Sequence, residues 1–168
     1  MRIGNQWWAV LLLLGVFGQS NQALAAQSKP QADTASYTEL GGYLHSDAET
    51  NAWYELLYRL RENFDEICGD TFCEGDYSNI QALRFVCSVE TGSGVLGQCV
   101  WTFAASHEEV DAATGRVAVA PKVWRCRAPL ARKTTAQALL GALAGERPLY
   151  APLPGTTKSI YDGLIDCL

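Results

Sequence analysis

Positive charge and histidine are scarce in this sequence of 168 residues. It holds 13 Lys and Arg against 18 Asp and Glu, and only two His. The net charge of −5 argues against general binding to nucleic acid or to an anionic membrane, because both favour basic proteins. His45 and His107 stand far apart without helper ligands, which argues against a zinc site.

Long apolar runs are absent after the first 18 residues. Arg2, the apolar residues 7–18 and the small-residue pattern at residues 23–25 are typical of a secretory signal. The run is short for a membrane span. We therefore expect residues 1–25 to be a cleaved signal peptide, with no stable membrane insertion afterwards; an uncleaved anchor is the alternative. Cleavage would remove Arg2 and no acid, leaving 12 basic and 18 acidic residues, a net charge of −6.

Six cysteines follow this segment: Cys68, Cys73, Cys87, Cys99, Cys126 and Cys167. An even number in an exported chain predicts three disulfides and a periplasmic or secreted location. Cys68 and Cys73 have C-x4-C spacing without a nearby cation, which disfavours thiol chemistry. We expect them to form a local disulfide, with cross-links to Cys126 or Cys167 as the alternatives.

The pattern of apolar residues predicts a flexible arm over residues 26–45, with residues 37–43 as its one candidate for order, and a single α+β domain over residues 46–168. Ser46 and Glu49 form a capping-box pattern, and Gly69 is a natural stop. Between them lies a helix whose apolar face has a period of 3.6 residues. That face is formed by Trp53, Leu56, Leu57, Leu60, Phe64 and Ile67.

Three strands are expected next, at residues 82–89, 97–110 and 116–128, as an antiparallel meander under the long helix. Placing Cys87 opposite Cys99 also aligns Phe85 with Trp101 and Leu83 with Phe103. Pairing Trp101 with Trp124 would instead bring Cys126 opposite Cys99, so Cys99–Cys126 competes with Cys87–Cys99. Two shorter helices complete the disulfide-stapled fold, the first capped by Thr134 and the second stapled by Cys167, most simply to Cys126.

An acidic run without a basic residue until Arg84 covers the end of the long helix and the loop after it. Its members are Glu62, Asp65, Glu66, Asp70, Glu74 and Asp76. The helix dipole disfavours negative charge at a C-terminus, so a positive group should offset it. One interpretation is internal salt bridges to the basic residues between positions 116 and 133; the other is a docking surface for a basic partner.

Catalytic and metal motifs are incomplete. An EF-hand alignment on Gly75 puts Phe72 and Gln81 where carboxylates are required, although an irregular calcium site at Asp70, Glu74, Asp76 and Asn79 stays open. Residues 91–94 lack the spacing of a nucleophile elbow, and residues 155–159 lack a phosphate-loop glycine. We expect no catalytic residue, metal or cofactor. The enzyme alternative, a hydrolase of cell-wall or glycan material, would use Ser106 with His107, or the cluster of Asp70, Glu74 and Asp76.

The segment CGDTFCEGDY, followed by LRFVCSV and GQCVWTF, resembles segments of small exported bacterial proteins without an assigned activity. The resemblance covers roughly residues 60–104. It implies export and a shared helix–loop–hairpin unit, and it carries no catalytic residue across. Together, these features predict a non-enzymatic exported binding protein of the bacterial cell envelope, inhibitor- or immunity-like, that engages a basic exported protein. A calcium-stabilised structural module is the third reading, and the oligomeric state is left open.

Overall fold

The computed structural model describes residues 35–168, apart from the side chains of Asp70 and Thr71. The predicted signal peptide and the first part of the predicted arm lie outside the described residues. In the described part, no helix combines the length and the apolar character needed to cross a membrane.

One antiparallel sheet has the strand order β1-β2-β3-β4. The strands are β1 (Tyr37–Glu39), β2 (Gln81–Glu90), β3 (Leu96–Val110) and β4 (Val117–Arg127). The α-helices are α1 (Leu40–Tyr43), α2 (Asp47–Ile67), α3 (Ala136–Ala142) and α4 (Ile160–Ile165), with a π turn η1 (Cys68–Phe72) and a 3-10 turn η2 (Gly75–Tyr77) after α2. The α+β class is confirmed, but the sheet has four strands rather than three. The additional strand β1 and helix α1 occupy residues 37–43, the part of the predicted arm that was its one candidate for order.

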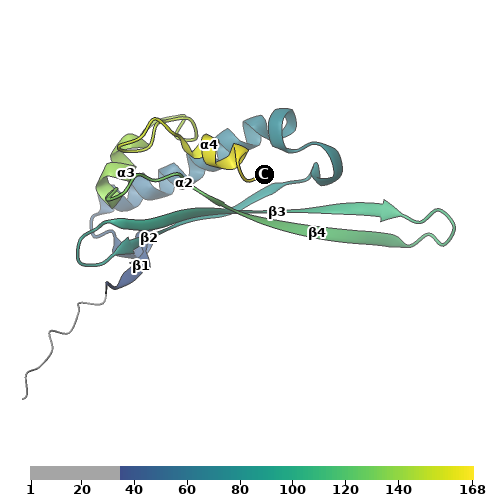
Figure 1. Ribbon diagram of the computed structural model, residues 1–168, viewed down its shortest axis with the longest axis horizontal. Coiled ribbons are helices and arrows are strands. Elements are labelled where there is room, and N and C mark those ends of the chain that lie inside the picture. Colours follow the sequence, from purple (N-terminus) through teal and green to yellow (C-terminus); the bar gives the residue numbers. More distant parts are fainter. Residues whose placement is uncertain (1–34) are drawn as a thin grey trace, which may run out of the picture. The chain divides into compact units, whose positions relative to one another are not determined.

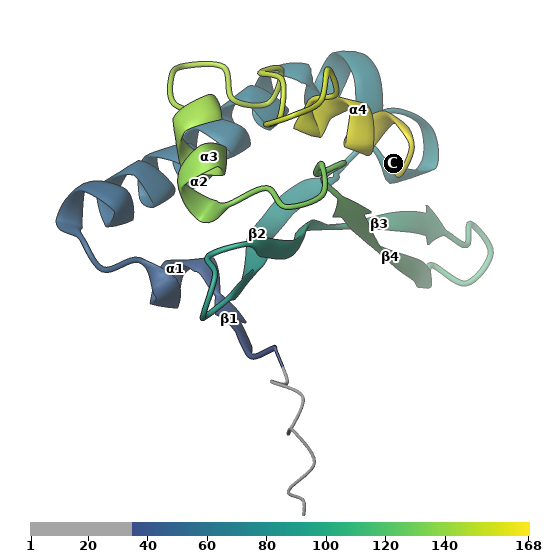
Figure 2. The ribbon, with the colours of Figure 1, turned by 60° about the vertical axis from the view of Figure 1, so that its left-hand side comes forward.

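The helices α2, α3 and α4 all lie over the same face of the sheet, here called the inner face (Figures 1 and 2). None of these three helices lies on the opposite, outer face in these views. Beyond Ala104, the last partner of β2, strands β3 and β4 continue as a two-stranded ribbon that projects past the body (Figure 1). We call residues 104–110 and 117–123 the ribbon.

Helix α2 begins where its sequence predicts. The Ser46 hydroxyl accepts a hydrogen bond from the Glu49 amide at 3.2 Å, which satisfies one free N–H group of the first turn. Helix α2 ends at Ile67 with Cys68 as its C-cap, so Gly69 is at the expected C′ position, but the π turn η1 continues the coil to Phe72. The Cys73 amide donates to the Cys68 carbonyl at 2.6 Å, and the Cys68–Cys73 disulfide closes the same turn.

Aromatic side chains join α2 to the sheet. The fully buried Phe64 has its ring centroid 4.7 Å from Phe103 and 5.8 Å from Trp101, both on β3. Phe72 of η1 stacks on the other side of Phe64 at 6.1 Å. Phe64 therefore holds the C-terminal end of α2 against both the sheet and the turn that follows.

The register of β2 on β3 is confirmed at Cys87–Cys99 and Phe85–Trp101. The third expected pair is wrong: Phe103 lies opposite Ala82, because a bulge at Leu83 interrupts the ladder. The Leu83 side chain is 49% exposed rather than buried on the inner face, and its carbonyl accepts a hydrogen bond from Arg61 at 3.1 Å.

The register of β3 on β4 differs from the expected one by two residues, since Trp101 pairs with Cys126 and Phe103 with Trp124. The turn between the strands explains the shift. Asp111 accepts hydrogen bonds from the Ala113 and Thr114 amides, and Gly115 has a φ of +69°. This capped loop occupies four residues between paired Asp111 and Arg116, whereas the expected register allows only two, and turn length fixes hairpin register.

Three disulfides connect Cys68 to Cys73, Cys87 to Cys99 and Cys126 to Cys167. Each is the pairing that the sequence favoured, and Cys99–Cys126 is ruled out because Cys99 pairs with Cys87. Such a set of disulfides is typical of proteins in an oxidising extracellular or periplasmic environment.

The last two helices begin at side-chain caps. The cap of α3 is Thr135, one residue later than expected, and Thr135 accepts from the Ala138 amide at 3.2 Å. Thr134 is buried and donates to the Ala131 carbonyl instead. Ser159 and Asp162 cap α4 reciprocally, and these hydrogen bonds lower the pKa of Asp162.

Replacing Phe64 with Ala should lower the free energy of unfolding by about 3–5 kcal/mol, because the change leaves a cavity between α2 and β3. Urea denaturation measures the loss. Tyr54→Ala is the matched control on the same helix: Tyr54 is 63% exposed, so its loss should cost no more than about 0.5 kcal/mol. Equal losses for the two variants would contradict the packing role of Phe64.

Replacing both cysteines of one disulfide with Ala should lower the free energy of unfolding. The loss should be larger for the disulfide that closes the longer loop. The Cys126–Cys167 bridge spans 41 residues and the Cys68–Cys73 bridge spans 5. The chain-entropy model gives losses of about 4 and about 2 kcal/mol, respectively. Urea midpoints of the two double variants measure the difference, and a larger loss for the short loop would refute the expectation.

Candidate functional site

We call the described carboxylates of the predicted acidic run the acidic surface. Its members are Glu62, Asp65, Glu66, Glu74 and Asp76. Glu62 is the member with cation and hydroxyl partners. Arg59 lies 2.9 Å from its carboxylate and 2.7 Å from that of Glu55. The hydrogen bond to Glu55, followed by that to Glu62, raises the pKa of Arg59. Tyr58 also donates to Glu62, and this bond raises the pKa of Tyr58.

The expected neutralisation by the basic strand is not found for these side chains. The salt bridges of residues 35–168, with Asp70 left aside, join Arg59 to Glu55 and Glu62, and Arg84 to Glu39. Lys122, which was a candidate partner, lies instead over the rings of Tyr77 and Trp124, 5.0 and 4.6 Å from their centroids. Asp65, Glu66, Glu74 and Asp76 are exposed.

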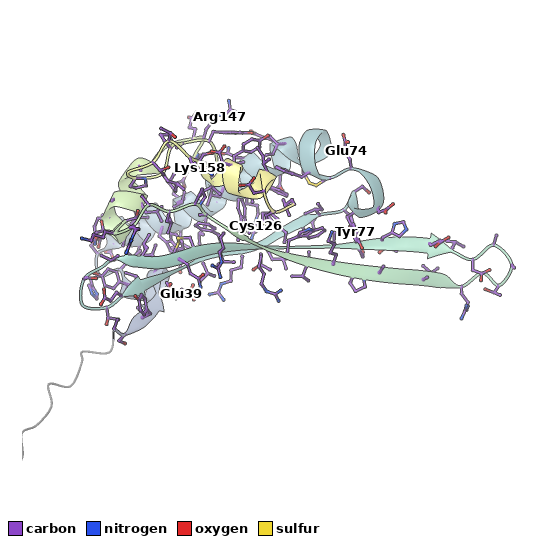
Figure 3. The ribbon with its side chains drawn as sticks, in the orientation of Figure 1. Glu39, Glu74, Tyr77, Cys126, Arg147 and Lys158 are labelled. Carbon is purple, nitrogen blue, oxygen red and sulfur yellow. A yellow bond between two sulfur atoms is a disulfide. The ribbon has the colours of Figure 1, made fainter. Side chains whose placement is uncertain are left out.

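Part of the acidic surface is concave. Glu62 and Glu66 line an open groove of about 420 Å³ with Glu146 from the loop after α3, and Arg59, Asn63 and Arg147 complete its walls. The Arg147 guanidinium lies 4.9 Å from the centre of the Tyr150 ring. Figure 3 shows Arg147 on the helical side of the sheet and Glu74 beyond the end of α2. Asp65, Glu74 and Asp76 do not line this groove, so the structure brings together only part of the predicted set.

Asn63 places Glu146 beside α2. Its side chain is only 3% exposed, donates to the Glu146 carbonyl at 3.2 Å and accepts from the Leu149 amide at 3.5 Å. We did not identify Asn63 or Glu146 from the sequence. The available signal was a polar residue between Leu60 and Phe64 on an otherwise apolar helix face, because a buried amide requires hydrogen-bond partners.

Ser106 and His107 form hydrogen bonds to residues 74–79, here called the acidic loop, and not to each other. The Ser106 amide donates to the Asn79 side chain at 2.9 Å, and Asn79 donates to the Ser106 hydroxyl at 3.1 Å. Nδ1 of His107 lies 3.1 Å from the Asp76 carbonyl oxygen, so a tautomer protonated at Nδ1 donates to it. Adjacent strand residues face opposite sides, and these two side chains form no hydrogen bond with one another among the described contacts.

A metal cluster is not assembled by the described residues, since no three His, Cys, Asp or Glu groups gather closely enough to hold an ion. The Asp70 side chain lies outside the described set. Of the irregular calcium site, the structure therefore describes Glu74, Asp76 and Asn79. Of these, Asn79 is engaged with Ser106.

A second groove, of about 410 Å³, lies between α1, α2 and the bulge of β2. Its walls include Trp53, Tyr54 and Phe85, with Arg61 and Arg84 as cations. The carboxylate in this lining belongs to Glu39, and Arg84 holds it at 2.8 Å. A paired set of carboxylates for acid–base catalysis is thus not present in the lining.

The chain matches no family model, no curated protein and no solved structure.

Replacing Asn79 with Ala should loosen the acidic loop, because both hydrogen bonds to Ser106 are lost. Hydrogen exchange at the Ser106 amide should accelerate, and so should exchange across residues 74–79. Asn51→Ala, on the exposed face of α2, is the control and should leave these amides unchanged. Unaltered exchange in Asn79→Ala would show that the side chain does not position the loop.

Proposed function

We propose that this chain is a non-enzymatic exported binding protein of the bacterial cell envelope, inhibitor- or immunity-like, that engages a basic exported protein through the acidic surface. The observation that carries the proposal is the groove lined by Glu62, Glu66 and Glu146. Within it, Glu62 has a salt bridge to Arg59, whereas Glu66 and Glu146 form none among the described residues. The groove therefore offers carboxylates to a cation from outside.

Three features support a binding role. Disulfides at the end of α2 and within the sheet stiffen the scaffold that presents the groove, and a preorganised surface loses less conformational entropy on binding. Complementary charge raises the association rate and disfavours acidic partners. Ser106 and His107, the residues of the hydrolase alternative, are engaged in positioning the acidic loop.

Reversing the charge of the groove tests the proposal. Glu66→Lys combined with Glu146→Lys should abolish capture of basic proteins from an envelope extract, because like charges would then face each other across the contact. Both substitutions are at groove carboxylates without a salt bridge, so the melting temperature should change little. Quantitative mass spectrometry of the captured proteins gives the readout.

The matched control is Glu109→Lys combined with Asp166→Lys, which makes the same change in net charge at exposed positions outside the groove. The control should capture the same basic proteins as the unchanged chain. Equal capture by the groove variant and the control would refute the proposed contact. Capture by the unchanged chain should also weaken as salt is raised, since exposed charges are screened.

A further inference from the structure

The outer face of the ribbon carries a stripe of exposed apolar side chains. Val110, Val117, Val119 and Val123 are 65%, 59%, 60% and 49% exposed, and Pro121 is exposed beside them. Alternation along the strands places all five on one face, opposite the inner face, on which Trp124 and Cys126 are buried. Contiguous exposed apolar side chains of this kind mark interaction surfaces.

The same face is polarised in charge along its length. Glu108 lies near the tip of the ribbon, paired across the strands with Val119. Arg125 and Arg127 lie at the base, paired with Thr102 and Val100. All three charged residues are exposed, and none forms a salt bridge within the described chain. Pro121 and Val123 therefore separate Glu108 from the two arginines, and Val110 and Val117 continue the apolar stripe beyond Glu108 to the tip.

Such a surface is complementary to itself when two copies meet with opposite strand directions. We place a two-fold axis between the two faces, perpendicular to the strands, at the level of the Ala105–Lys122 pair. Val119 and Arg125 lie three residues on either side of this level along β4, so they are equidistant from the axis. This axis stacks the Glu108–Val119 level of one copy on the Thr102–Arg125 level of the other. The axis keeps β3 over β3 and β4 over β4, so each Glu108 lies at the level of the Arg125 of the second copy but one strand away. The long side chains of Glu108 and Arg125 can meet across this offset, twice by symmetry.

The free edge of β4 is a poorer contact than its face. The Ala128 amide donates to the Cys99 carbonyl, and the Ser106 amide donates to Asn79, away from β4. Even-numbered residues of β4 therefore hydrogen-bond to β3, and the main-chain groups of odd-numbered residues point to the free edge. Pro121 is one of these and has no N–H group, so an added strand would lose a ladder bond at the centre of the ribbon. Proline at such a position protects an edge from pairing.

We propose that the outer face of the ribbon is the contact surface of a two-fold symmetric dimer of this chain, with Pro121 and Val123 at its centre and Glu108–Arg125 ion pairs on both sides. This contact is independent of the acidic surface proposed for a partner. Because the apolar patch on each copy is small, association should be weak and should depend on protein concentration.

A charge swap on the disulfide-bonded protein tests the dimer. Sedimentation velocity over a range of concentrations should show a monomer–dimer equilibrium for the unchanged chain. Glu108→Arg and Arg125→Glu should each weaken association at least about tenfold, because each places like charges together at two symmetric positions. The double variant Glu108→Arg with Arg125→Glu should recover association to within about threefold, which distinguishes contact from damage to the fold.

Glu109→Arg is the control, since Glu109 is the neighbour of Glu108 on the same strand and points to the opposite face. This variant should associate like the unchanged chain. A monomer at every concentration for the unchanged chain would overturn the proposal. So would failure of the double variant to recover association, or an equal loss in Glu109→Arg.

Discussion

The contact between Phe64 and the aromatic side chains of β3 is the constraint on which the rest of the structure depends. Phe64 is fully buried, and its ring lies against Trp101 and Phe103 on one side and Phe72 on the other. The contact fixes how far along the sheet α2 ends and where the disulfide-closed turn begins. Glu62 and Glu66, two residues before and two residues after Phe64, line the groove with Glu146 of the loop after α3. Packing in the core thus determines the form of the acidic groove.

The parts of the fold that follow from local pattern could be predicted, and those set by turns or distant contacts could not. The periodicity of α2, its Ser46 cap and the Cys87–Cys99 register rest on neighbouring residues and agree with the structure. The Trp101–Trp124 pairing was wrong because it leaves only two residues for the turn between β3 and β4, whereas the loop capped by Asp111 occupies four. Strand β1 is only three residues long, which is too short to show an alternating pattern in the sequence. It is recognised by its pairing with β2, a contact with residues far along the chain. The groove likewise depends on a buried Asn63 that reaches a loop 83 residues away.

The separation of charge follows from the alternation of side chains along β4. Arg125 and Arg127 occupy positions that point to the outer face, whereas α2 covers the inner face. The sheet therefore lies between these arginines and the carboxylates of α2, and the presence of two oppositely charged segments in the sequence does not predict pairing across it. Lys122 does point inward, but the rings of Tyr77 and Trp124 hold its ammonium group, an arrangement stabilised by cation–π attraction.

This layering also means that the two proposed contacts do not compete. A dimer formed through the outer face would leave both copies of α2 on the far sides of the assembly, with both acidic grooves open. A partner that displays two basic sites could then be held by both grooves, so that the second contact becomes intramolecular and the overall affinity rises without any new contact. Weak association through a small apolar patch suits such an arrangement, because a divalent partner would strengthen the dimer by binding across it. The coupling would vanish if the span between the two sites of the partner did not match the span between the grooves.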